Sequence, residues 1–261
     1  MNAATMMGTQ PQRPVWLRLV RARPSSFWIQ DSRVLTNTAT EICSQSDTCG
    51  EHVRAGEWLD FRTRRSYAGN VRIAFKEWVV VVDALGRGEQ ILVLRKGGLL
   101  DGGNGFRLEH SSFLLFPTMF HQQRDSVMPS ARERFDFLAA HQSDENQIRF
   151  EFCAVVVCSE RLDNPNFIQR LHGQHIWRDE LIAQRFDWGA EAGVEALAVR
   201  VYQLPTPIEV PMSPAYRGCK SWVELETDIS TDQSRPVLSD EAFDLKLKQF
   251  HSALESAPAS A

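Results

Sequence analysis

Hydrophobic and polar residues follow regular periods from Val71 onward. Residues 73–85 place apolar side chains at helical spacing and stop at Gly86, which predicts a helix. The four valines at 79–82 are β-branched, so a strand is the competing prediction for that part. Further apolar runs predict strands over residues 90–95, 106–109, 113–116 and 148–158.

The second half of the chain alternates between helical and strand patterns. Helices are predicted over residues 117–123, 129–138, 166–171 and 178–186, and strands over 197–201 and 221–225. Four prolines between 205 and 214 predict an extended loop. These elements predict an α+β fold, in which a mixed sheet is flanked by helices, within one domain over residues 71–226.

Two appendages are expected outside this domain. At residues 227–261 the pattern predicts a polar linker, a helix with Phe243, Leu247 and Phe250 on one face, and a loose tail. Residues 1–70 contain no lysine, nine arginines and six acidic residues, whereas the rest of the chain carries a net charge of −7. We expect a poorly ordered extension there, and one hypothesis is that Val71 is a start codon and residues 1–70 are a start-site artefact.

Composition narrows the class of protein. The apolar runs are strand-sized, far below the roughly 20 residues needed to cross a bilayer, and no basic-then-apolar leader opens the chain. Five irregularly spaced cysteines fit reduced thiols, so we expect a soluble, cytoplasmic protein with no membrane partner. The formal charge of −4 gives no overall basic signature for nucleic acid. Phosphate-loop, dinucleotide, zinc-protease and nucleophile-elbow motifs are absent from the sequence.

A glycine-rich segment is the first candidate site. Arg95 and Lys96 precede five glycines between residues 97 and 105, beginning with Gly97 and Gly98. Backbone N–H groups of such a turn can approach an anion, and the two cations would complement its charge. The alternative is a flexible hairpin connection.

Acidic and histidine residues around this segment are the second candidate. Glu109 and His110 end a predicted strand, and His121 lies on the following helix. Together with Glu77 they could bind a metal or transfer a proton, and Mg²⁺ is the cofactor that this hypothesis implies. Taken singly, His110 fits a polar edge position and Glu77 a solvated helix face.

Residues 216–222 are the third candidate. Arg217 and Lys220 could hold an anion, Trp222 could stack on a ligand, and Cys219 could act as a nucleophile beside a base. The alternative is a terminal strand whose tryptophan fills the core while the cations are solvated.

The order of these motifs resembles a known family. The motifs are Lys76-Glu77-Trp78, residues 92–98, Phe106 with Glu109-His110, residues 113–118, His121-Gln122, Trp188-Gly189, residues 200–202 and residues 218–223. Over about residues 71–226 they resemble the uncharacterised bacterial domain of unknown function family 1802. That resemblance implies no activity.

The predicted element order also resembles the core of restriction-endonuclease-like nucleases: helix, three strands, helix, strand. The resemblance implies a Mg²⁺ site with one acid followed by an acid-x-Lys triplet. Glu109 matches the first acid, with Lys96 as the expected lysine. The chain's only acid-x-Lys triplet is residues 244–246, in the predicted C-terminal helix.

Two hypotheses follow for function. The first is a phosphate- or nucleic-acid-handling protein in which Glu77 and Glu109 bind metal, Arg95 and Lys96 hold phosphate, and a histidine moves a proton. The second is a non-catalytic binding or adaptor module that uses the glycine-rich turn and residues 217–222. Convergence of these side chains in one cleft would favour the enzyme, and their separation would favour the module.

Overall fold

A computed structural model describes residues 69–96, 106–141, 144, 146–189 and 191–255, all within the compact unit Cys49–Ala261. The expectations for residues 1–68 and for the glycine-rich segment 97–105, including Gly97 and Gly98, lie outside the described residues.

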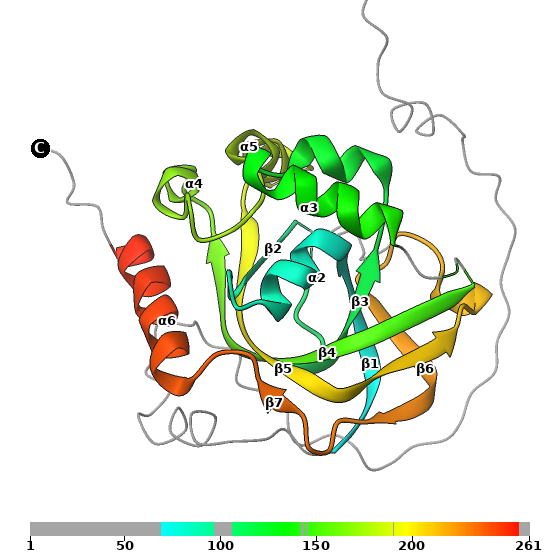
Figure 1. Ribbon diagram of the computed structural model, residues 1–261. Helices are drawn as coiled ribbons and strands as arrows, with labels where there is room; N and C mark the ends of the chain where they lie inside the picture. Colours follow the sequence, from blue (N-terminus) through cyan, green and yellow to red (C-terminus); the bar gives the residue numbers. More distant parts are fainter. Residues whose placement is uncertain (1–68, 97–105, 142–143, 145, 190, 256–261) are drawn as a thin grey trace, which may run out of the picture. The chain divides into compact units, whose positions relative to one another are not determined.

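A mixed seven-stranded sheet forms the centre of the described part (Figure 1). Its strands are β1 (Asn70–Trp78), β2 (Leu92–Arg95), β3 (Ser112–Thr118), β4 (Gln147–Leu162), β5 (Val194–Pro211), β6 (Trp222–Ser230) and β7 (Arg235–Pro236). The order is β2-β5-β4-β3-β1-β6, with β7 paired to β5. Strands β1 and β3 are parallel, and the other pairs are antiparallel. The α+β prediction is therefore confirmed.

Helices flank this sheet. They are α2 (Val79–Gly86), the 3₁₀ helix η2 (His121–Ser126), α3 (Pro129–Ala140), α4 (Phe167–Arg170), α5 (Asp179–Asp187), the 3₁₀ helix η3 (Pro214–Tyr216) and α6 (Asp240–Glu255). Helix α2 contacts β1, β3, β5 and α3, so it is enclosed between the sheet and α3 (Figure 1). Five of its eight residues are buried, which fits a helix that is apolar on nearly every side.

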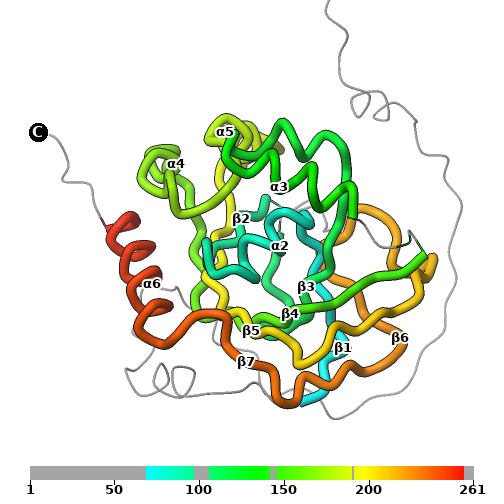
Figure 2. The backbone as a smooth tube through the Cα atoms, in the orientation of Figure 1, coloured from blue at the N-terminus to red at the C-terminus, as the bar shows by residue number. Residues whose placement is uncertain are grey.

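The sheet has a hydrophobic cluster on each face. On the helical face, side chains such as Phe75 and Phe113 pack with residues of α2, α3, α5 and α6. On the opposite face, Leu114 and Tyr202 pack with residues of β6 and with Tyr216 of η3. Figure 2 shows how the long strands β4 and β5 bend as they pass α2. This bend lets the second face form its own core without a covering layer of helices.

The first predicted helix is wrong in part. Residues 73–78 belong to β1, because they pair with β3 on one side and β6 on the other. The helix begins at Val79, so the alternative of a strand over the four valines is also wrong. The element order therefore starts strand, helix, strand.

Several later boundaries also differ from prediction. Residues 106–109 form no strand; instead Phe106 is buried against the aromatic rings of Phe75 and Trp222. The helix expected from Pro117 begins only at η2, because β3 continues beside β1 through Thr118.

The expected proline loop and polar linker are largely strand. Pro205 and Pro207 lie in β5, where its pairing with β4 is interrupted between residues 203 and 208, a position that tolerates the missing N–H. Residues 227–230 extend β6, and 235–236 form β7.

The other long elements match prediction. Helix α6 has Phe243, Leu247 and Phe250 on one face, as expected, but these side chains are buried in the helical-face core, so the helix packs on the domain rather than forming an appendage. The strand predicted over residues 148–158 is the middle of β4. In the described ranges, none of the helices has the length and apolar character that a membrane crossing requires.

Candidate functional site

Two adjacent residues at the end of β1 lie on opposite faces of the sheet. Lys76 is in register with Phe116 of β3, and Glu77 with Pro117. Alternation along a strand sends successive side chains to opposite faces. Glu77 therefore joins the helical side, and Lys76 joins the side that holds the second core.

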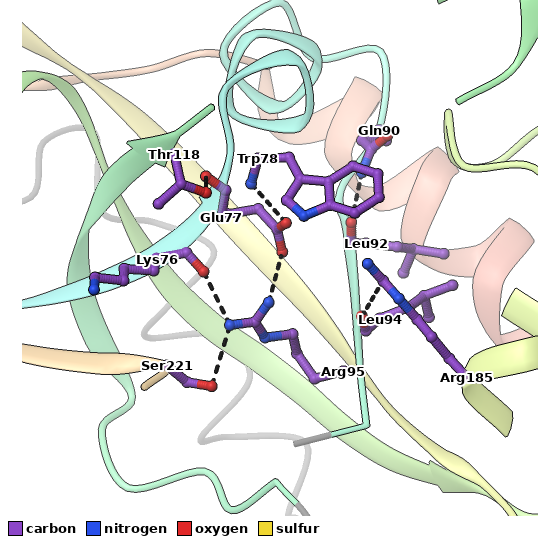
Figure 3. Close-up of polar contacts among 10 residues, drawn as sticks. All are labelled: Lys76, Glu77, Trp78, Gln90, Leu92, Leu94, Arg95, Thr118, Arg185 and Ser221. Atoms are coloured by element: carbon purple, nitrogen blue, oxygen red, sulfur yellow. Dashed lines mark hydrogen bonds and ion pairs between the residues drawn. The ribbon is translucent and has the colours of Figure 1, made fainter. Parts of the chain in front are cut away.

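Glu77, Arg95 and Arg185 form a buried charge cluster on the helical side (Figure 3). The Glu77 side chain is fully buried, and its Oε1 accepts the Trp78 backbone N–H at 2.8 Å. Its Oε2 lies 3.7 Å from Nη1 of Arg95 and has no hydrogen-bond donor among the described residues.

Arg95 links two distant parts of the sheet. Its Nη2 donates to the Lys76 carbonyl at 3.0 Å and to Ser221 Oγ at 3.1 Å, and its guanidinium lies 4.6 Å from the centre of the Phe75 ring (Figure 3). Strands β2 and β1 are separated in the sheet by β5, β4 and β3. The curved sheet thus brings the ends of β1 and β2 together, and Arg95 joins them.

Arg185 reaches the cluster from α5. It donates to the Leu94 carbonyl at 3.3 Å and lies 4.9 Å from the Trp78 ring and 5.8 Å from the Trp177 ring. Burial lowers the pKa of Arg185 to about 10, against an opposing effect of Glu77. The cluster therefore has one carboxylate for two guanidinium groups. Aromatic packing and hydrogen bonds to backbone carbonyls hold the two guanidinium groups in place.

Lys96 has a structural role in the described chain. Its Nζ donates to the carbonyls of Phe186 at 3.0 Å and Gly193 at 2.9 Å, and also to that of Glu191. Burial is the main cause of the lowered pKa of Lys96. These three bonds hold the chain that follows α5.

The structure does not join the other predicted catalytic residues to this cluster. Glu109 and His121 are exposed, and the partly buried His110 ring lies nearly perpendicular to the Trp222 ring, with 5.2 Å between the ring centres. Among the described residues, no hydrogen bond or ion pair links any two of Glu77, Lys96, Glu109, His110 and His121, and no group of three His, Cys, Asp or Glu side chains could hold a metal ion. The described part of the chain therefore offers no cluster for the expected Mg²⁺.

The segment at 216–222 divides between core and surface. Trp222 packs 4.8 Å from Phe75 and 5.2 Å from Phe113, and its Nε1 donates to the Arg107 carbonyl at 3.1 Å. Lys220 Nζ donates to the Ala215 carbonyl at 2.6 Å. The tryptophan thus fills an aromatic cluster, and of the two cations in this segment it is Arg217 that lines a cavity.

This cavity has a volume of about 690 Å³ and lies where the parallel strands β1 and β3 end. That volume is within the range of small-molecule sites, and the carboxyl ends of parallel strands are a common place for them. Its walls come from β1, α2, β3, α3, β4 and η3 and from the turns beside them, including Met212 just after β5.

Most charges on the cavity wall are already paired. Asp83 accepts from Arg87 and Arg134, and Arg149 donates to Glu151 at 2.6 Å. Lys76 and Arg217 differ, because within the described ranges neither forms an ion pair with a carboxylate. The cavity therefore carries two cations that no described carboxylate pairs.

Lys76 lies between the cavity and the turn before β6. Its Nζ donates to the Gly218 carbonyl at 2.9 Å and lies 5.5 Å from the centre of the Phe116 ring. Burial and the nearby charge of Lys220 lower the pKa of Lys76, and Cys219 opposes them.

The rest of the wall is largely apolar. Side chains of this kind are Phe116, Met119, Phe120, Leu138, Phe152 and Met212. Phe120 is 62% exposed, so much of its side chain is accessible to a ligand. The cavity thus combines an apolar wall with a basic edge. Sequence reasoning named Arg217 as a candidate anion-binding residue but missed the cavity, because its walls come from separate elements. The signal left unused was Lys76 within the Lys76-Glu77-Trp78 motif.

Fold and site together define an α+β domain with an open, basic-edged cavity. The family model described as domain of unknown function (DUF1802) matches residues 74–249, and the chain belongs to this family. The match passes residue 226, where the resemblance drawn from the sequence ended, and includes much of α6. Neither the curated proteins nor the solved structures gave a match. The kinship with restriction-endonuclease-like nucleases stays a prediction.

Proposed function

We propose that this domain is a binding module for a small anionic molecule with an apolar or aromatic body, held in the cavity beside β1 and β3. The observation that carries this proposal is the pair of uncompensated cations, Lys76 and Arg217, on an otherwise apolar or charge-paired wall. An anion that entered would replace the missing counter-charge, and the apolar wall would bury the rest of the ligand.

A phosphate or carboxylate group suits these two side chains. The Arg217 guanidinium can donate two parallel hydrogen bonds to such a group, and the Lys76 ammonium can add a third. Helix α2 begins beside them at Val79, and among the described residues no side chain caps its first turn. The positive end of a helix dipole further favours an anion.

Binding is favoured over metal-dependent cleavage of nucleic acid. A cleavage site would need Glu77, Glu109 and Lys96 to converge, but Glu77 is buried against Arg95 and Lys96 donates to three carbonyls. A cavity of this volume suits a single nucleotide-sized molecule rather than a duplex. Calorimetric binding of Mn²⁺ that is lost in Glu109→Ala would instead support the cleavage hypothesis.

Calorimetry on the full chain tests the proposal with three related probes: phenyl phosphate, phenol and inorganic phosphate. We expect phenyl phosphate to bind more tightly than either fragment, because it alone uses both the cations and the apolar wall. Arg217→Gln should weaken its binding by at least about tenfold, because even one of its two charge-assisted hydrogen bonds is worth roughly 1.5 kcal/mol.

Arg235→Gln is the matched control, because Arg235 is exposed on β7 and does not line the cavity. Its affinity for phenyl phosphate should equal that of the wild type. Equal losses in Arg217→Gln and Arg235→Gln, or no binding of phenyl phosphate and of a wider panel of aromatic phosphates and carboxylates, would show that the proposal is wrong.

A further inference from the structure

Lys76 is unlike the other lysines of this chain. The sequence has five: Lys76, Lys96, Lys220, Lys246 and Lys248. Four of their ammonium groups donate to backbone carbonyls, and Lys248 is exposed on α6. Lys76 alone among the five lines the cavity.

The surroundings of Lys76 disfavour its charged form. The ammonium is partly buried, forms no ion pair with a described carboxylate, and has Lys220 as a neighbouring cation. The Phe116 ring, 5.5 Å away, and the Gly218 carbonyl act in the opposite direction, because both attract the charged form. Burial and this like charge both lower the pKa of Lys76. A lysine that is partly desolvated and close to a second cation is the arrangement that exposes a neutral, nucleophilic amine.

Lys96 provides an internal contrast. Burial lowers its pKa as well, but its Nζ donates to three carbonyls, which occupy all three hydrogens of the ammonium. Lys76 has one such bond, to the Gly218 carbonyl. Since Lys76 lines the cavity and a single carbonyl holds its amine, it can lose a proton and present its lone pair to a ligand there.

We propose that Lys76 Nζ forms a reversible imine with the carbonyl group of an aldehyde or ketone that carries an anionic group. The amine lone pair attacks the carbonyl carbon and the C=O π bond opens, while a proton passes from nitrogen to oxygen. The nitrogen lone pair then forms the C=N bond as the C–O bond breaks, and the hydroxyl leaves as water together with the second proton of the nitrogen. Amine and carbonyl thus give imine and water, with no oxidation or reduction.

The ligand class rests on the function proposed above. The anionic group would lie at Arg217, and this placement would hold the carbonyl carbon near Lys76. Positioning of this kind raises the effective concentration of the carbonyl at the amine.

The test is reductive trapping on the full chain with 4-carboxybenzaldehyde and cyanoborohydride near neutral pH. Hydride reduces the iminium to a stable secondary amine, which peptide mass spectrometry locates. We expect labelling at Lys76 to saturate with aldehyde concentration and to exceed that at the other four lysines. Phenyl phosphate should compete with it, and Lys220→Gln should slow it severalfold because the like charge is gone.

Labelling at Lys76 is compared with labelling at the other lysines of the same wild-type protein. The main result therefore does not depend on whether a variant folds. Equal labelling of the five lysines, or labelling of Lys76 without saturation, would overturn the inference. If Lys76 is not labelled but phenyl phosphate still binds through Arg217, the imine is wrong and the proposed function stands. If neither occurs, both are wrong.

Discussion

Lys76 and Glu77 are neighbours on β1, but they lie in opposite kinds of electrostatic environment. Glu77 enters a closed cluster in which Arg95 and Arg185 are packed against aromatic rings and bonded to backbone carbonyls. Lys76, one residue earlier, lies at an open cavity with Arg217, and neither cation has a partner carboxylate among the described residues.

The difference separates charges that hold the fold from charges that can meet a ligand. A buried ion pair gains little net stability, but removal of one partner leaves an uncompensated charge and costs much. A cation at an open cavity with no partner among the described carboxylates leaves no unpaired charge behind when it is removed, and it is available to an incoming anion. Stability and binding should therefore respond to different residues.

The largest effect is expected for Glu77→Gln. It would leave Arg95 and Arg185 without a counter-ion in a buried site, so the free energy of unfolding should fall by about 3–5 kcal/mol. Urea unfolding of the full chain measures the change. The exposed Glu109→Gln is the matched control and should stay within about 0.5 kcal/mol of the wild type. Similar values for the two variants would remove the distinction between the closed cluster and the open cavity.

A buried histidine on the helical side of the sheet should make the stability of the fold sensitive to acid. His175 is 3% exposed, its ring lies 5.8 Å from Trp177, and neither ring nitrogen has a hydrogen-bond partner among the described residues. Burial lowers the pKa of His175 from 6.5 to about 4, with Asp179 opposing this and His172 adding to it. The folded state therefore binds fewer protons than the unfolded state between these two values.

The contribution of His175 to the free energy of unfolding is thus fully present above about pH 6.5 and is lost as the pH falls toward 4. At pH 5 the loss from this one group is about 2 kcal/mol. Urea unfolding at pH 7 and pH 5 checks the prediction. His175→Asn should lose less stability over that interval than the wild type. An identical loss in both proteins would mean that His175 does not carry the pH dependence.

A smaller change in stability is expected at Gly86, where the core adjoins the cavity. A Cβ at Gly86 would lie 2.3 Å from Cζ of the Phe152 ring, which also lines the cavity. We expect Gly86→Ala to cost about 1 kcal/mol, at the low end for overpacking, because the ring can shift into open space. Binding of phenyl phosphate should weaken as the ring enters the cavity. In a Phe152→Leu background the stability cost should disappear; a persistent cost would place the strain elsewhere.

Helix α2 shows where sequence patterns are not enough. Its four valines favour a strand locally, and their apolar spacing favours a helix. Enclosure by β1, β3, β5 and α3 decides the conformation, because a helix satisfies its own backbone hydrogen bonds in a site where every side is apolar. Helix α6 and β4 were predictable, since each has one clear period over its whole length.

The candidate site was less predictable than the fold. Arg217, Lys220 and Trp222 suggested one ligand-binding segment, but strand pairing places Trp222 opposite Phe75 in the aromatic cluster, and Lys220 bonds to a backbone carbonyl. Lys76 and Arg217 meet at the cavity only through the pairing of β1 with β6 and the turn after η3. Such proximity depends on topology, which no local motif records.

The smallest change in stability is expected at the residue that matters most for binding. Arg217 is exposed and forms no ion pair with the described residues, so Arg217→Gln should alter the free energy of unfolding by less than about 0.5 kcal/mol. Its melting curve should therefore overlay that of the wild type without ligand, and separate from it when phenyl phosphate is added, because the wild type binds more tightly and gains more stability from bound ligand. A large loss of stability without ligand would place Arg217 with Glu77 among the residues that hold the fold, and would leave the cavity with Lys76 as its one open cation on the described wall.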